Sequence, residues 1–432
     1  MAQATTHPVS GARTRTGVGV AAVAWVVAAT FYFYQYVVRS APSVMMPQLS
    51  DAFGLSALGV ASVVGLYYYG YAPFGLVAGV SIDRLGTRWL LPAASAVMCV
   101  GALLFATGSP EVAGAGRFLQ GAGGTFAAVG ALYIAANYFE PSKSGTLTGA
   151  TQMFGMAGGS AGQFAVGPLI GAGVAWDAFW VGMAVVSLLL GVSLWFLLPK
   201  EEEKKTGRPD NWMKGTAAAF KVVFRNPQSI LCGLIAGLLF IPTTIFDMVW
   251  GVRYLQEAHG LDYGSAVMRS ATVPFGWIIG CPLLGLVSDR LGRRKPVIIG
   301  GACLLLACMA WILYGPAGVF PPYVLGLVTG VASGAAMLPY TVIKEANPPQ
   351  LAGTATGVIH FLNFTFSALL GPAFAGILQR ASGGATQLER VDFQTAFAPM
   401  LYGVAFAILL ALLLKETGAA ARTATHGATE EA

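Results

Sequence analysis

The sequence contains few charged residues. Asp, Glu, Lys and Arg together make up 10% of its 432 residues, whereas hydrophobic residues make up 56%, and the mean hydropathy is +0.67. A soluble domain carries about 25% charged residues, so this composition indicates a membrane protein. The net charge of +6 is not gathered into a basic face with interleaved aromatic residues, and nucleic acid is therefore not an expected partner.

Signals of catalysis and of metal binding are missing as well. The chain has no HExxH or GxSxG motif, and GRFLQGAGG at 116–124 lacks the Lys-Ser/Thr pair of a phosphate-binding loop. The five cysteines stand singly in apolar segments, which predicts buried thiols rather than disulfides or a metal site. They are Cys99, Cys232, Cys281, Cys303 and Cys308. We therefore expect no enzyme activity, no cofactor and no metal.

Long apolar runs are abundant. A hydrocarbon core about 30 Å thick needs about 20 residues of helix, and the runs predict an all-α membrane protein with twelve transmembrane helices. The expected spans are 18–46, 58–80, 89–109, 113–138, 147–171, 176–198, 228–255, 266–287, 296–315, 320–343, 354–379 and 395–414. The expected organisation is a cytoplasmic tail at 1–16, a six-helix bundle at 17–198, a cytoplasmic linker at 199–227, a second six-helix bundle at 228–414 and a cytoplasmic tail at 415–432.

The basic residues predict the orientation. If the amino terminus is cytoplasmic, 19 of the 25 Lys and Arg residues, with every lysine among them, fall on the cytoplasmic side. The other six are Arg39, Arg117, Arg253, Arg269, Arg380 and Arg390. We expect both termini to be cytoplasmic, the first span to be uncleaved, and the membrane to be a bacterial inner membrane.

The two halves repeat each other. GVSIDRLGTRW at 79–89 recurs 206 residues later as GLVSDRLGRRK at 285–295, and GTLTG at 145–149 recurs 208 residues later as GTATG at 353–357. Duplicated helical units with a site at their interface, near the middle of the bilayer, are typical of secondary transporters.

The repeated loop resembles the G-x-L-a-D-R-x-G-R-R motif of the major facilitator superfamily. Its first copy matches at Gly79, Asp83, Arg84, Gly86 and Arg88, with Ser81 and Thr87 departing from the pattern, and its second at Gly285, Asp289, Arg290, Gly292, Arg293 and Arg294. GRFLQGAGG is similar to the R-x-L-Q-G motif of the fourth span. The chain also resembles bacterial relatives of lysosomal dipeptide transporters and amino-acid transporters of intracellular bacteria. The resemblance implies alternating access, with the loop cluster as a cytoplasmic gate, to which Lys344 and Glu345 are also assigned.

Charges within the spans are the main candidates for a site, because hydrocarbon strongly disfavours them. Arg39, in FYFYQYVVRSAP, either lines the central cavity as an anchor for a carboxylate or reaches the outer interface. Asp247 lies two residues from the position that the 206-residue repeat assigns to Arg39. We hypothesise that the two pair when the outer side closes and separate when it opens; a fixed structural pair is the alternative.

Other polar and aromatic residues are weaker candidates. Arg117, near Gln120, is either a structural contact or a substrate or coupling residue. His360, which the repeat matches to Gln152, is either a hydrogen-bonded packing residue or a proton carrier. The remaining candidates for the cavity wall are Tyr34, Tyr68, Asn363, Trp250, Trp277 and Tyr340. Interface belts and simple packing would also account for the aromatic ones.

Together these features predict a secondary active transporter of a small organic solute, either an amino acid or dipeptide or a carboxylate. Energy would come from a gradient, with protons as the coupling ion and the lipid bilayer and the solute as the other partners. A proton-coupled drug-efflux antiporter and a non-transporting nutrient sensor are the alternatives. We expect a monomer.

Overall fold

The computed structural model describes residues 18–139, 141–199, 212–316, 321–348, 351–385 and 387–418. The expected tail at 1–16, most of the tail at 415–432 and residues 200–211 of the expected linker lie outside these ranges. Within them the chain is helical and contains no strand.

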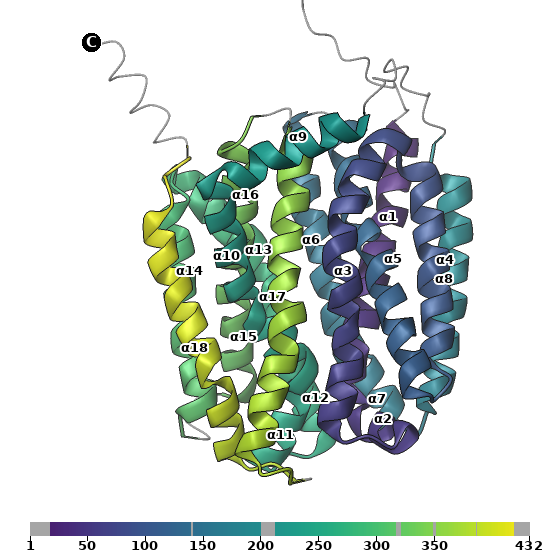
Figure 1. Ribbon diagram of the computed structural model, residues 1–432, viewed down its shortest axis with the longest axis vertical. Coiled ribbons are helices and arrows are strands. Elements are labelled where there is room, and N and C mark those ends of the chain that lie inside the picture. Colours follow the sequence, from purple (N-terminus) through teal and green to yellow (C-terminus); the bar gives the residue numbers. More distant parts are fainter. Residues whose placement is uncertain are drawn as a thin grey trace, which may run out of the picture.

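The first half of the chain forms six membrane-crossing segments (Figure 1). They are α1 (Val18–Ser40) with the 3-10 turn η1 (Ala41–Val44), α3 (Ala57–Leu85), α4 (Thr87–Phe105), α5 (Pro110–Asn137), α6 (Pro141–Phe164) with α7 (Val166–Gly171), and α8 (Trp176–Leu197). The short helix α2 (Met46–Phe53) joins the first segment to the second.

The second half repeats this arrangement with more interrupted helices. Its segments are α10 (Pro227–Ile241) with the π-helical η2 (Pro242–Gly251) and α11 (Val252–His259), α12 (Tyr263–Ser270) with α13 (Thr272–Leu291), α14 (Lys295–Tyr314), α15 (Pro322–Ser333) with η3 (Gly334–Met337) and α16 (Leu338–Glu345), α17 (Ala352–Ala381), and α18 (Arg390–Leu413). Helix α9 (Trp212–Arg225) precedes them and lies across one end of the molecule (Figure 1).

The prediction of an all-α membrane protein made of two six-helix bundles is confirmed. Eleven segments among the described residues are long and apolar enough to cross a membrane. The twelfth, α6 with α7, is rich in Gly, Ser, Thr and Gln, and it packs against α1 and α13. A β-carbon at Gly158 would lie 2.1 Å from the Phe33 carbonyl oxygen, so small residues allow the backbones of α6 and α1 to approach closely.

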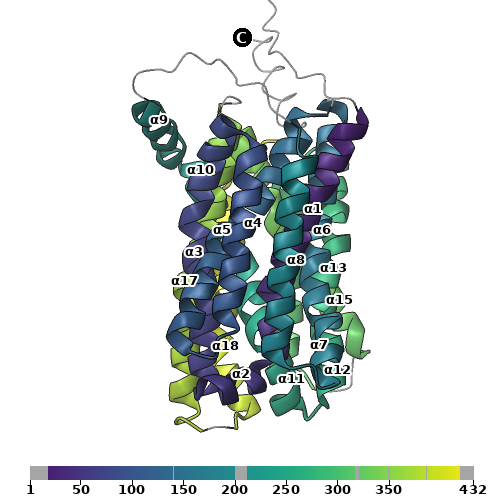
Figure 2. The same ribbon diagram turned by 90° about the vertical axis from the view of Figure 1, so that its right-hand side faces the viewer.

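The bundles meet along two seams. Helix α3 packs on α17 on one side, and α6 packs on α13 on the other (Figure 2). Within the first bundle α3 also lies very close to α5, because a β-carbon at Gly121 would lie only 1.9 Å from the Tyr67 carbonyl oxygen. This contact fixes the height of Tyr67 and its neighbours relative to Arg117.

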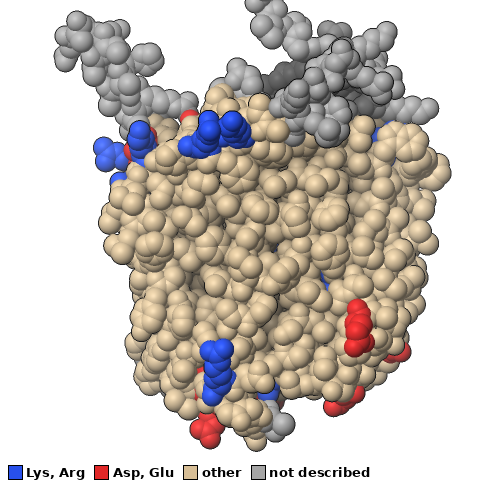
Figure 3. Space-filling model, viewed as in Figure 1, with Lys and Arg blue, Asp and Glu red and all other residues tan. Residues whose placement is uncertain are grey.

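The molecule has two distinct ends. One end, which we call the linker face, carries α9, the beginning of α1 and the end of α18 (Figure 1). The other end, which we call the distal face, carries α2, α7, α11 and α12. Charged side chains gather toward these ends on the face shown in Figure 3. The band between them is almost wholly uncharged there, as the hydrocarbon core of a bilayer requires.

Candidate functional site

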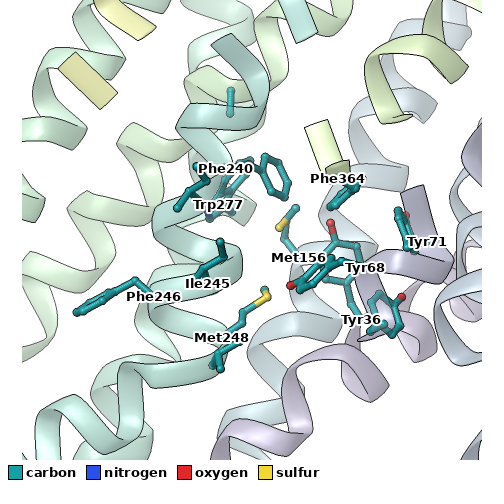
Figure 4. Close-up of a cluster of buried hydrophobic side chains, with 14 of the residues drawn as sticks. Tyr36, Tyr68, Tyr71, Met156, Phe240, Ile245, Phe246, Met248, Trp277 and Phe364 are labelled. Atoms are coloured by element: carbon teal, nitrogen blue, oxygen red, sulfur yellow. The ribbon is translucent and has the colours of Figure 1, made fainter. Parts of the chain in front are cut away.

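Arg39 ends α1 in the middle of the protein, buried to 2% exposure. Five aromatic rings surround its guanidinium carbon and form what we call the aromatic cage. The distances to the ring centroids are 4.7 Å for Phe364, 4.9 Å for Tyr36, 5.0 Å for Tyr68, 5.5 Å for Tyr71 and 5.9 Å for Tyr67. Both bundles contribute to the cage (Figure 4). The arginine therefore lies between the bundles and not at the membrane interface.

The guanidinium of Arg39 lacks an ionic partner. Its Nε donates a hydrogen bond to the Tyr68 hydroxyl at 3.3 Å, but Nη1 and Nη2 are buried without a hydrogen-bond partner. In the described part of the chain no Asp or Glu oxygen lies within 4.0 Å of it. Aromatic faces attract a cation but do not replace its hydrogen bonds. The free edge of the guanidinium is thus ready to accept a carboxylate in two-point contact.

Other unpartnered polar atoms surround the cage. They are the Tyr71 hydroxyl, both ring nitrogens of His360 and the Asn363 side-chain oxygen. The His360 ring lies 6.1 Å from that of Tyr71 and 5.4 Å from those of Phe364 and Tyr340, and Asn363 donates to the Tyr340 hydroxyl at 2.8 Å. Since buried polar groups are normally hydrogen-bonded, this concentration of free donors and acceptors around Arg39 makes this region a candidate site for a polar ligand. We call these residues the central site.

Arg117 is buried too, but its hydrogen bonds are satisfied within the protein. It donates to the Val38 carbonyl at 3.0 Å, the Val64 carbonyl at 3.3 Å and Gln120 at 2.7 Å. Pro42, four residues after Val38, has no N–H to offer that carbonyl, and Arg117 provides a donor in its place. These contacts favour the structural alternative for Arg117, in which it holds α1 next to Arg39.

The expected ion pair between Arg39 and Asp247 does not form in this structure. Asp247, buried to 4% exposure, accepts a hydrogen bond from the Ser270 hydroxyl at 2.9 Å and lines a cavity inside the second bundle. The reason is the wide π-helical turn η2, which directs Asp247 toward α12. The carbonyl of Thr244 on the same turn instead accepts a hydrogen bond from Tyr68 at 3.0 Å.

The remaining candidates divide into three sets. Tyr68 and Tyr340 lie at the central site, and Gln152 joins the bundles by donating to the Met337 sulfur at 3.3 Å. Three others pack away from it: Tyr34 donates to the Met183 carbonyl at 2.9 Å, Trp277 donates to Thr243 at 2.9 Å, and Trp250 lies over Arg253.

Four cage residues were not among the candidates. Tyr36 lies three residues before Arg39, and Phe364 four residues after His360, which places each on the same helical face as a chosen candidate. Tyr67 and Tyr71 share a face in the same way. Helical spacing from Arg39 and His360 would have identified the first two.

The bundles are joined by hydrogen bonds from mid-height to the distal face. The Tyr263 hydroxyl reaches the Val44 carbonyl at 2.5 Å and the Gly167 carbonyl at 3.2 Å, and Ser160 donates to the Ala271 carbonyl at 3.0 Å. On the distal side of this closure, a cavity of about 460 Å³ lies between the bundles. We call it the distal vestibule.

The repeated loop motif lies at the linker face. Arg294 pairs with Glu345 at 3.1 Å and with Asp289, and Gly292 adopts a left-handed backbone with φ of 62°. In the first copy, Arg88 donates to the Leu198 carbonyl, Gly86 has φ of 71°, and the side chains of Asp83 and Arg84 lie outside the described part. Arg290 and Arg293 are exposed, whereas Gly79 and Gly285 lie within helices α3 and α13, where a β-carbon would meet no atom closer than 4.0 Å.

Two repeated six-helix bundles around a buried polar site between them define a membrane transporter of the secondary type. The family model "Major Facilitator Superfamily" matches residues 28–372, and the chain belongs to this superfamily. The family resemblance noted in the sequence is thereby confirmed.

Several characterised proteins are similar to the chain. A hexuronate transporter of Bacillus subtilis is 27% identical over 81% of this chain and 85% of its own. The chloramphenicol resistance protein CraA of Acinetobacter baumannii is 28% identical over 66% and 69%, and a cis,cis-muconate transport protein of Acinetobacter baylyi is 24% identical over 86% and 92%. The inward-facing, unoccupied structure of a bacterial homologue of the lysosomal transporter Spinster shares the fold, with a TM-score of 0.69, 15% identity and coverage of 92% and 98%.

Proposed function

We propose that this protein is a secondary active transporter that moves a small organic carboxylate across the membrane by alternating access, driven by the proton gradient. The observation that carries the proposal is the buried guanidinium of Arg39, whose Nη1 and Nη2 have no partner. A carboxylate bound there would supply both the missing charge and the missing acceptors, which makes a carboxylate the ligand that fits best.

The surroundings of Arg39 favour a carboxylate over a zwitterion. An acidic side chain near the arginine would bind the ammonium group of an amino acid or dipeptide, but Asp247 is directed toward Ser270 instead. The free Asn363 oxygen and His360 nitrogens are suited to hydroxyl or carbonyl groups of the solute. Two of the similar proteins, the hexuronate transporter and the cis,cis-muconate transport protein, carry organic acids by name.

The contacts between the bundles support alternating access with the distal side closed. Tyr263 and Ser160 join the bundles between the distal vestibule and the central site. We assign the linker face to the cytoplasm because the excess of Lys and Arg falls there, which places both termini inside and the closure on the outer side. Protons are proposed as the coupling ion because Asp247 and His360 are buried titratable groups without an ionic partner.

A drug-efflux antiporter is the second candidate. The similarity to CraA and the five rings of the aromatic cage favour it. A neutral or cationic drug would use the rings but would leave the guanidinium of Arg39 without an acceptor. The requirement for Arg39 therefore separates the two candidates.

The test compares ligands that differ in the carboxylate alone. Thermal unfolding of the purified protein is followed with glucuronate and with glucose, and in parallel with cis,cis-muconate, a dipeptide and chloramphenicol. A ligand at a hundred times its dissociation constant adds about 2.7 kcal/mol to the stability of the state that binds it. We expect glucuronate or muconate to stabilise wild type and not Arg39→Met, and glucose to stabilise neither.

The other outcomes identify the alternatives. Chloramphenicol stabilising both proteins equally would contradict the carboxylate proposal and favour efflux. A carboxylate that binds but is not exchanged by proteoliposomes would instead indicate a sensor.

A further inference from the structure

We propose that Asp247 is the proton-binding group of the transport cycle, and that a cavity inside the second bundle connects it to the distal face, separately from the route of the solute. The inference rests on the proposed function, because that function makes the proton the coupling ion of transport. The observations on Asp247 and its cavity do not depend on which solute is carried.

The cavity lies among η2, α11, α12, α14 and α15 and has a volume of about 130 Å³. It begins at Asp247 and Ser270 and reaches Gly315, Pro316 and Pro321, which lie between α14 and α15 at the distal face. This volume is several times the minimum needed for a water molecule. Polar groups along the path provide partners for water, and a chain of waters is a route for protons.

Asp247 has the geometry of a group that is loaded from this cavity. Its Oδ1 accepts from the Ser270 hydroxyl at 2.9 Å, and its buried Oδ2 has no partner. A β-carbon at Gly251 would lie 2.7 Å from the Ser270 hydroxyl oxygen and 3.1 Å from Oδ1, so glycine at this position leaves room for the contact. A buried carboxylate without a counter-ion is strongly disfavoured. Binding on Oδ2 a proton that comes from the distal solution and is relayed by water in the cavity removes the charge and leaves the hydrogen bond to Ser270 in place.

Few charged groups share the cavity with Asp247. Arg269, His259 and Tyr254 line it from α11 and α12, and no described Arg, Lys or His nitrogen lies within 4.0 Å of the carboxylate. The residues that α14 and α15 contribute, which include Met309 and Thr329, carry no charge. A proton is thus the simplest means of neutralising Asp247.

The turn η2 connects this carboxylate to the central site. The Thr244 carbonyl accepts from the Tyr68 hydroxyl, which in turn accepts from Arg39 Nε. Met248, next to Asp247, points toward the cage side and lies against Gly159 of the first bundle, whereas Phe246 points away (Figure 4). Binding of an anion at Arg39 and of a proton at Asp247 therefore act on the same ten-residue turn. A rearrangement of η2 as the bundles rock would release the proton to water on the linker side.

The first test uses purified protein without any solute. Infrared spectra recorded across a pH titration detect the carbonyl stretch of each protonated carboxyl group. We expect one such band to be absent in Asp247→Asn and to change frequency in Ser270→Ala, which removes its hydrogen bond. Glu111→Gln, at an exposed carboxylate outside the cavity, should leave the band unchanged. Persistence of every titrating band in Asp247→Asn would overturn the proposal, whatever the solute. If Asp247→Asn fails to fold, the test uses Ser270→Ala alone. An unchanged spectrum in Ser270→Ala would then overturn the proposal.

The second test measures coupling in proteoliposomes with glucuronate as the probe. We expect Asp247→Asn to lose accumulation driven by an inward proton gradient while it retains exchange of glucuronate at equal pH. Accumulation equal to that of wild type, or accumulation driven by sodium in place of protons, would refute the role of Asp247. If wild type neither binds nor exchanges glucuronate, the proposed function loses support, whereas the infrared result still decides the proton site.

Discussion

Replacement of Arg39 by methionine should weaken binding of the solute without weakening the empty protein. The side chain holds a buried charge, and it makes only a 3.3 Å hydrogen bond to Tyr68. Burying a charge without hydrogen bonds carries an effective penalty of several kcal/mol, and the cation–π contacts of the cage, at about 0.5–2 kcal/mol each, offset part of it. We expect Arg39→Met to be as stable as wild type within about 1 kcal/mol, or more stable.

Arg117 provides the matched control. Both arginines are buried in the first bundle, but Arg117→Met would leave the Val38 carbonyl and the Gln120 side-chain oxygen without the donor they have now. Each buried acceptor that loses its partner costs about 1–3 kcal/mol. Arg117→Met should therefore be destabilised by roughly 2–6 kcal/mol. The two substitutions remove the same chemical group, and the structure predicts different effects on stability.

The affinity for the solute should change in the opposite order: Arg39→Met should lose more affinity than Arg117→Met. Two charge-assisted hydrogen bonds from Arg39 to a carboxylate contribute about 1.5–3 kcal/mol each, so their loss should weaken binding at least about 100-fold. Thermal unfolding with and without glucuronate measures both quantities on the same samples. If Arg39→Met unfolds as readily as Arg117→Met and is still stabilised by the carboxylate, Arg39 is a structural residue and the reasoning fails.

Three further outcomes are expected. Tyr71→Phe removes a hydroxyl that has no partner in the empty protein, so its melting temperature should be unchanged while solute affinity falls by about 3- to 10-fold; equal losses of both would contradict a binding role. Tyr263→Phe removes the contact across the distal closure, which should raise labelling from the distal side of a cysteine placed at Asn363, in the central site behind the closure, by about 2- to 10-fold; an unchanged rate would exclude Tyr263 from the closure. Although burial raises the pKa of Glu416, backbone N–H groups, that of Arg294 first among them, hold this pKa below its ordinary value of 4.5. The contact should therefore be intact above pH 4.5 and be lost as the pH falls below it. The protection of the Arg294 amide against hydrogen exchange, relative to its intrinsic rate at each pH, should then fall on acidification and, in Glu416→Gln, be low at every pH.

The sequence was sufficient for the fold because its signals are local and repeated. Apolar runs of about 20 residues predicted twelve spans, and the duplicated GVSIDRLGTRW and GLVSDRLGRRK loops related the two halves. Even α6, whose composition is weakly apolar, was expected as a span, because 147–171 was read as one of the twelve apolar runs. Arg39 was identified as a site residue for an equally local reason, since a charge inside an apolar run is rare.

The direction of individual side chains was not accessible in this way. Alignment of the halves placed Asp247 beside Arg39, but that reasoning assumed a regular helix with 3.6 residues per turn. The π-helical turn at Pro242–Gly251 adds a residue to the turn and rotates Asp247 toward Ser270. Likewise, the choice between Arg39 and Arg117 as ligand or structural residue depended on which carbonyls lay within reach, and those carbonyls belong to helices distant in the sequence.

The separation of the two charges explains how the protein keeps a free arginine in its interior. If Asp247 faced Arg39, the two would neutralise each other, and a solute would have to displace a buried ion pair before binding. Instead, Arg117 holds the carbonyl of Val38, the residue preceding Arg39, and five rings surround the guanidinium, so the cation is positioned and partly stabilised without an anion. Under the proposed function, the carboxylate of the solute would provide the compensation that the protein itself lacks. Under this proposal, solute binding at Arg39 and protonation at Asp247 are distinct events, and the Tyr68 contact to η2 links them. That link is the minimum that coupling between a solute and a proton requires.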